Sequence, residues 1–200
     1  MNEETKRVGA LNLPNLLSLL RMILVPFFVW SVLAMDMHTL LGRVVPAAIF
    51  AVTAFTDFLD GYIARRYHLV TNFGKFLDPL ADKFMVFAAL FVMVYRYTYL
   101  SSVFVWVTVV IIFRELAVTS LRLVAAGQAG KVIAAAWSGK LKTVSQIIGI
   151  LVIILEPLWA GAYGNVMYAS YAMMALMTFT TLWSGLDYLR AYLPVLDLNR

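Results

Sequence analysis

Residues 57–82 read DFLDGYIARRYHLVTNFGKFLDPLAD, a polar stretch inside an otherwise apolar chain. Eight of its positions form the pattern D-x-x-D-G-x-x-A-R, followed after a gap of eight residues by G-x-x-x-D-x-x-x-D. These positions are Asp57, Asp60, Gly61, Ala64, Arg65, Gly74, Asp78 and Asp82. Four of the 11 acidic residues of the chain therefore fall in this one stretch. A carboxylate at membrane depth is energetically unfavourable, so the cluster requires compensating positive charge.

The composition indicates that the surrounding chain lies in a membrane. Of the 200 residues, 62% are hydrophobic and 14% are charged, and the mean hydropathy is +0.84. A soluble domain is far more polar, and apolar runs long enough to cross a bilayer recur along the chain. We expect an all-α, polytopic membrane bundle of six transmembrane helices that forms a single domain over residues 1–200. The expected spans are 15–35, 43–64, 76–97, 102–125, 141–160 and 166–189.

The segments between the spans are less regular. Glu156-Pro157, followed by Gly161 and Gly164, predicts a turn between the last two spans. Residues 126–140 fit a loop, an interfacial helix or a continuation of the fourth span. Cysteine is absent, which excludes disulfides and thiolate chemistry.

Basic residues are concentrated in alternate loops. The residues on one side are Lys6, Arg7, Arg65, Arg66, Lys75, Arg122, Lys131, Lys140 and Lys142. The opposite loops hold Arg43 and Arg96, so both termini and the mouth of the motif are expected to face the cytoplasm. The net charge of +5 then reflects topology and anionic lipid rather than a nucleic-acid partner. No transit peptide or cleavable signal is evident, which favours a bacterial inner membrane.

The spacing of the motif predicts that its carboxylates converge. On a helix, the first two aspartates, the glycine and the alanine recur at i, i+3, i+4 and i+7 and share a face. The polar segment 65–75 is expected to connect two antiparallel helices. Asp57 lies as far from its centre as Asp82, and Asp60 as far as Asp78, so each pair should face across the hairpin. The cluster would lie roughly 10 Å below the cytoplasmic surface.

Divalent cations are the expected compensating charge. Four bare carboxylates this close would repel one another and raise one another's pKa values. Hard cations such as Mg²⁺ or Mn²⁺ remove that repulsion and prefer oxygen ligands. A pair of these ions in one carboxylate site suits phosphoryl chemistry. Gly61 and Gly74 allow a phosphate or nucleotide to approach the backbone, and Arg65 is placed to pair with a phosphate.

Two other interpretations use the same carboxylates. Acidic residues inside a membrane also form ion or proton pathways in transporters. Alternatively, Arg21, Lys83 and Arg114 would pair with the aspartates in a purely structural role. Neither interpretation explains why the aspartates, glycines and arginine stand at regular spacing.

The motif resembles the signature of the CDP-alcohol phosphotransferase family at every fixed position. The resemblance implies an enzyme that moves a phosphatidyl or similar group from a CDP-linked donor to an alcohol and releases CMP. It implies that Asp57, Asp60 and Asp78 bind metal, while Asp82 binds the second metal and acts as general base. Spacing alone does not distinguish Asp82 from Asp57 as the base. The CDP-lipid would contact Asn15, Asp57, Asp60, Gly61, Arg65, Thr71 and Gly74. A homodimer is also implied only by this resemblance.

Three stretches outside the motif resemble the branch of this family whose acceptor is glycerol 3-phosphate. They are NLPNLLS at 12–18 leading to Arg21, FRE at 113–115 with Arg122, and WSGKLKT at 137–143 followed by Gln146. The donor would be CDP-diacylglycerol and the product phosphatidylglycerophosphate. Phosphatidylglycerol, serine and inositol phosphate are the alternative acceptors.

A dianionic acceptor requires cations beside the metals. The candidate acceptor-phosphate residues are Arg114, Arg122, Lys140 and Lys142. The positive-inside rule alone also explains Lys140 and Lys142. Arg114 lies inside the fourth span, and we expect Glu115 to point elsewhere on that helix, so that an intrahelical ion pair does not account for it.

Overall fold

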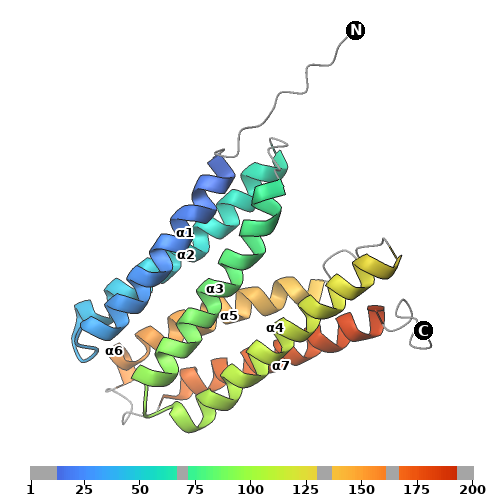
Figure 1. Ribbon diagram of the computed structural model, residues 1–200. Helices are drawn as coiled ribbons and strands as arrows, with labels where there is room; N and C mark the ends of the chain where they lie inside the picture. Colours follow the sequence, from blue (N-terminus) through green and yellow to red (C-terminus); the bar gives the residue numbers. More distant parts are fainter. Residues whose placement is uncertain (1–12, 67–71, 130–136, 161–166, 193–200) are drawn as a thin grey trace. The chain divides into compact units, whose positions relative to one another are not determined.

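The computed structural model describes residues 13–66, 72–129, 137–160 and 167–192. Within these ranges the chain forms seven helices and no strand, which confirms the all-α prediction (Figure 1). The helices are α1 (Leu13–Ala34), α2 (Leu40–Arg66), α3 (Asn72–Arg96), α4 (Ser101–Ala129), α5 (Trp137–Leu155), α6 (Pro157–Ala160) and α7 (Tyr168–Tyr192).

Four of these helices are long and apolar enough to cross a bilayer. The candidate spans are Asn15–Ala34, Leu40–Ile63, Ser102–Ala125 and Trp137–Leu155. Large apolar side chains such as Trp106 and Phe113 point outward from α4 and are more than two thirds exposed, at 71% and 73%. Such a surface is suited to lipid rather than water. The chain is therefore a membrane protein.

The first of two compact units ends at Ala89 and contains α1, α2 and most of α3. Helices α1 and α2 pack along each other, with Phe28 and Phe50 meeting at a ring-centroid distance of 5.3 Å. Pro26 and Pro46 lie inside these helices. Proline is tolerated there because neighbouring helices and local backbone adjustments satisfy the freed groups in membrane proteins.

The second unit begins at Leu90 and is organised around α7, which packs against both α4 and α5. Its contact with α5 depends on a small residue, since a Cβ added to Gly149 would lie 2.4 Å from Met177 Sδ. Polar side chains link the same pair. Ser145 Oγ lies 2.7 Å from Thr180 Oγ1, and Gln146 Nε2 donates to Thr181 Oγ1 at 3.2 Å. Close backbones and such hydrogen bonds drive helix association in a bilayer.

The helix ends differ from several predicted boundaries. The connection after α2 is confined to residues 67–71 instead of 65–75, so Arg65 and Arg66 belong to α2 and Lys75 to α3. Helix α5 begins at Trp137 rather than near 141. Apolarity marks the membrane-embedded part of a helix, whereas lysine and arginine are good helix formers that extend it.

The predicted break at Glu156-Pro157 is confirmed, because α5 ends at Leu155 and the short helix α6 begins at Pro157. Glu156 is buried and accepts hydrogen bonds from the backbone N–H groups of Ala169, at 2.7 Å, and Ser170, at 2.5 Å. A carboxylate on these N–H groups satisfies donors that the first turn of α7 leaves open. In the ambiguous segment 126–140, residues 126–129 belong to the end of α4 and residues 137–140 to the start of α5. Residues 130–136 lie outside the described residues.

Candidate active site

The first polar cluster joins α1 to the motif on α2. The guanidinium of Arg21 spans two carboxylates, with Nη1 2.5 Å from Asp57 Oδ1 and Nη2 paired with Asp60 Oδ2. Ser18 Oγ donates to the same Asp60 oxygen at 3.3 Å. Arg21 and Asp60 are buried, whereas the Asp57 side chain is 31% exposed. The structure therefore brings two motif aspartates together around one cation.

The sequence places Ser18 and Arg21 in the stretch that resembles the glycerol 3-phosphate branch of the family, and it makes Arg21 a counter-ion of the aspartates only in the structural interpretation. The ion pairs confirm that Arg21 pairs with aspartates of the motif. The available signal was a polar stripe on an apolar helix: Asn15, Ser18 and Arg21 recur at every third position, and all three are buried. Asn15, an expected contact of the CDP-lipid, thus lies on the helix that supplies Arg21.

The structure describes only some of the remaining motif residues in full. Gly61 lies on α2 and Asp82 on α3, both partly buried, and Asp82 Oδ1 is itself buried. The helices α2 and α3 also carry Arg65, Gly74 and Asp78, whose side chains lie outside the described part, as does the whole of Thr71. The predicted facing of Asp57 with Asp82 and of Asp60 with Asp78 stays a prediction.

The observed ends of α2 and α3 keep Asp60 and Asp78 equally far from the connection between the two helices, and the predicted facing depends on this equal spacing. Asp60 lies as many residues before the last residue of α2, Arg66, as Asp78 lies after the first residue of α3, Asn72. Each is roughly 9 Å along its helix from that end. A shorter connection therefore preserves the equal spacing of the two aspartates.

A second polar cluster lies in the other unit, between α4, α5 and α7. Glu115 Oε1 accepts from Arg114 Nη1 at 3.0 Å and also pairs with Lys142 Nζ. All three residues are buried. The prediction that Glu115 points away from Arg114 is wrong. Adjacent helix positions diverge, but the long arginine side chain turns back to a carboxylate that Lys142 also engages.

Residues of α7 enclose Arg114. Its Nη2 donates to Ser184 Oγ at 2.5 Å, and its guanidinium carbon lies 5.4 Å from the ring centre of Tyr188. A Cβ added to Gly185 would come within 3.2 Å of Arg114 Cγ. The arginine is thus held by an ion pair, a hydrogen bond and a cation–π contact in a slot that a larger residue at 185 would narrow.

The four acceptor candidates divide into two kinds. Arg114 and Lys142 are brought together on Glu115, and the three side chains carry a net charge of one positive unit. Arg122, near the end of α4, and Lys140, in the first turn of α5, are exposed. The first pair is buried and ion-paired, whereas the second pair lies at the surface.

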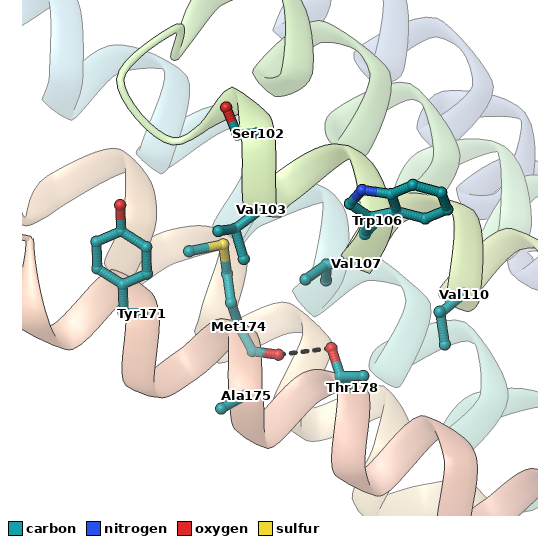
Figure 2. A pocket seen from close by; sticks show the side chains of 9 residues that line it. All are labelled: Ser102, Val103, Trp106, Val107, Val110, Tyr171, Met174, Ala175 and Thr178. Carbon is teal, nitrogen blue, oxygen red and sulfur yellow. Dashed lines mark hydrogen bonds between the residues drawn. The ribbon is translucent and has the colours of Figure 1, made fainter.

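An apolar pocket of about 440 Å³ lies between α4 and α7 (Figure 2). Its lining includes Val103, Trp106 and Val107 from α4 and Met174 from α7, and no charged residue contributes to it. The one hydrogen bond drawn there is internal to α7, from Thr178 Oγ1 to the Met174 carbonyl at 2.8 Å. The pocket therefore supplies apolar surface but no group for acid–base or metal chemistry.

The donor set of the first cluster fits a divalent cation. Within the part of the chain whose side chains are described, no group of three or more acidic, histidine or cysteine residues surrounds one point. Two carboxylates nevertheless converge on the guanidinium of Arg21, which marks a position where positive charge is stabilised. Carboxylate oxygens are the ligands that Mg²⁺ and Mn²⁺ prefer.

The fold and the motif together define the class of this protein, because it is an all-helical membrane protein that carries the acidic motif on consecutive helices. The chain matches the model of the CDP-alcohol phosphatidyltransferase family over residues 11–183 and belongs to that family. Enzymes of this family are generally dependent on divalent metals.

Named relatives narrow the comparison. The chain is 44% identical over 156 residues to the CDP-diacylglycerol–glycerol-3-phosphate 3-phosphatidyltransferase of Bacillus subtilis, covering 74% of this chain and 78% of that protein. It is 40% identical over 182 residues to a probable phosphatidylglycerophosphate synthase of Mycobacterium tuberculosis, covering 91% and 82%. With the Escherichia coli K12 CDP-diacylglycerol–glycerol-3-phosphate 3-phosphatidyltransferase it shares 37% identity over 186 residues, covering 90% and 94%.

Proposed function

We propose that the chain transfers the phosphatidyl group of CDP-diacylglycerol to glycerol 3-phosphate, which yields phosphatidylglycerophosphate and CMP. The names of the relatives support this choice of donor and acceptor. The structural observation that carries it is the buried Arg114–Glu115–Lys142 cluster, because its net positive charge suits a small phosphorylated acceptor.

The donor diphosphate would bind at the motif. Asp57, Asp60, Asp78 and Asp82 would hold two divalent cations, Mg²⁺ or Mn²⁺, which offset charge on the diphosphate and on departing CMP when bound. The glycines of the motif would let the CDP moiety approach the helix backbone, and Arg65 would pair with a phosphate. Asn15 and Thr71 complete the proposed CDP-lipid contacts.

The acceptor phosphate would bind to the second cluster. Arg114 offers a fixed guanidinium fork and Lys142 a point charge, and both are already oriented before an acceptor arrives. The exposed Arg122 and Lys140 would attract the dianion toward them from the cytoplasm.

Asp82 would act as the general base. Its carboxylate takes the proton from the primary hydroxyl of glycerol 3-phosphate. The hydroxyl oxygen forms a bond to the phosphorus that carries diacylglycerol, and the bond from that phosphorus to CMP breaks. The helix α3 that carries Asp82 also carries Asp78, so the same element would hold the donor and accept the proton.

The proposed topology has six spans with both termini in the cytoplasm of a bacterial cell. The four apolar spans are joined by α3 and α7, each of 25 residues. Helices of this length extend roughly 37 Å and suffice to cross the hydrocarbon core. The donor would enter sideways between helices with its acyl chains in the bilayer, and the enzyme would work as a homodimer in the inner membrane.

The deciding experiment measures CMP release by the purified protein with CDP-diacylglycerol and Mg²⁺. Separate reactions contain glycerol 3-phosphate, serine, inositol phosphate or phosphatidylglycerol. Release with glycerol 3-phosphate alone is the expected result. Release with another acceptor would retain the family and change the proposed substrate. Metal uptake into proteoliposomes without CMP release would instead support a transporter.

A further inference from the structure

The buried arginine of α1 has no role in the reaction proposed above, although it contacts two residues of the motif. Arg21 lies wholly out of solvent and engages Asp57 at 2.5 Å as well as Asp60. These are carboxylates that the proposed metal site requires. One positive charge thus already occupies part of the space between them.

The geometry of this group differs from that of a one-to-one ion pair. One guanidinium on α1 contacts two carboxylates that both lie on α2, three residues apart. Arg21 and Asp60 are buried, and removal of one partner of a buried ion pair is costly. The placement of both carboxylates therefore depends on the same arginine.

Arg21 and a metal ion would compete for the same oxygens. Asp57 Oδ1 and Asp60 Oδ2 are the atoms that the guanidinium contacts. A divalent ion bound to either oxygen would stand within a few ångströms of a fixed positive charge, where repulsion is strong at low dielectric. The guanidinium has to withdraw, or the ion binds more weakly than it would to the carboxylates alone.

We propose that Arg21 is a built-in counter-ion of the metal site: it holds Asp57 and Asp60 in position while metal is absent and lowers the affinity of the site for metal. The inference rests on the proposed function, since the metal site is itself proposed. Arg21 acts through the carboxylates and is a positioning residue. Ser18 has a complementary role, because its hydrogen bond to Asp60 keeps that carboxylate oriented as the guanidinium moves away.

The planar shape of arginine is part of this role. Two Nη atoms of one guanidinium reach two different carboxylates, which a single ammonium group does not reproduce. Arg21→Gln removes the charge, and Arg21→Lys keeps it but loses the two-sided contact. The two substitutions separate the charge of the residue from its geometry.

The test measures Mn²⁺ binding to purified, EDTA-stripped protein by the EPR signal of free Mn²⁺, together with the melting temperature in EDTA. We expect Arg21→Gln to melt at a lower temperature than the wild type without metal. We also expect it to bind Mn²⁺ with a dissociation constant lower by about tenfold or more. Arg21→Lys should shift both quantities in the same directions by smaller amounts. If the glutamine variant does not fold, the lysine variant decides the question.

Arg190→Gln is the matched control, because it removes the same charge from an exposed position on α7. Its Mn²⁺ affinity should equal that of the wild type. Unchanged or weaker Mn²⁺ binding in the Arg21 variants would overturn the inference and leave a purely structural ion pair. Failure of the wild type to bind Mn²⁺, or an unaltered titration in Asp57→Asn, would instead refute the proposed metal site and this inference with it.

Discussion

At the scale of single residues, one side chain in each polar cluster forms ion pairs with two others. Arg21 spans two carboxylates, and Glu115 spans two cations. Each central residue is buried and contacts a side chain on another helix. Substitution of a central residue therefore disturbs two partners, whereas substitution of a surface charge disturbs few or none.

The general base is the residue whose loss should separate catalysis from binding. Asp82→Asn keeps the size of the side chain but cannot accept the proton from the acceptor hydroxyl. We expect kcat to fall by about 100-fold or more, with CDP-diacylglycerol binding largely retained. Steady-state kinetics and a donor-binding assay measure the two effects, and Asp36→Asn in the exposed loop before α2 is the control. Near-normal kcat in Asp82→Asn would show that another group takes the proton.

The two lysines near the start of α5 make a matched pair for the acceptor site. Lys142 is buried against Glu115, and Lys140 is exposed. Lys142→Gln should raise the KM for glycerol 3-phosphate by about tenfold or more, because a preoriented cation is lost. Lys140→Gln should change it much less, since solvent screens that charge. Equal effects of the two substitutions on KM would contradict a preorganised site at Lys142.

At the scale of elements, sequence reasoning succeeded where periodicity and charge spacing decide the structure. The motif positions fall on two consecutive helices, and the break at Glu156-Pro157 is confirmed. Sequence reasoning failed where long side chains form ion pairs across helices. Glu115 pairs with Arg114 and also with Lys142, 27 residues away in the chain, and no local pattern specifies the second contact.

The α5–α7 contact should be sensitive to volume at one position. Gly149→Val adds branched carbon where even a Cβ would lie 2.4 Å from Met177 Sδ. We expect a loss of about 1–3 kcal/mol from overpacking, seen as a lower melting temperature in detergent. Met177→Ala in the same chain should restore part of that loss. Ile148→Val on the exposed side of α5 is the control and should have little effect. No rescue by Met177→Ala would mean that the two helices do not meet at this point.

At the scale of the whole molecule, the topology is directly measurable because the chain contains no cysteine. His38→Cys, in the exposed connection between α1 and α2, should react with an impermeant maleimide in intact spheroplasts. Arg190→Cys, in the last turn of α7, should react only after the membrane is opened. The unmodified protein supplies a background without label. Reaction of both sites in intact spheroplasts would contradict six spans with cytoplasmic termini.

The buried Glu156 has a consequence for the order in which this protein is made. Its carboxylate follows the last residue of α5, but its hydrogen-bond donors, Ala169 and Ser170, are in the first turn of α7. A ribosome translates the glutamate before either donor exists. Until the final helix emerges, the acid lacks these two donors, so the structure around Glu156 is completed only after the first turn of α7 has been synthesised.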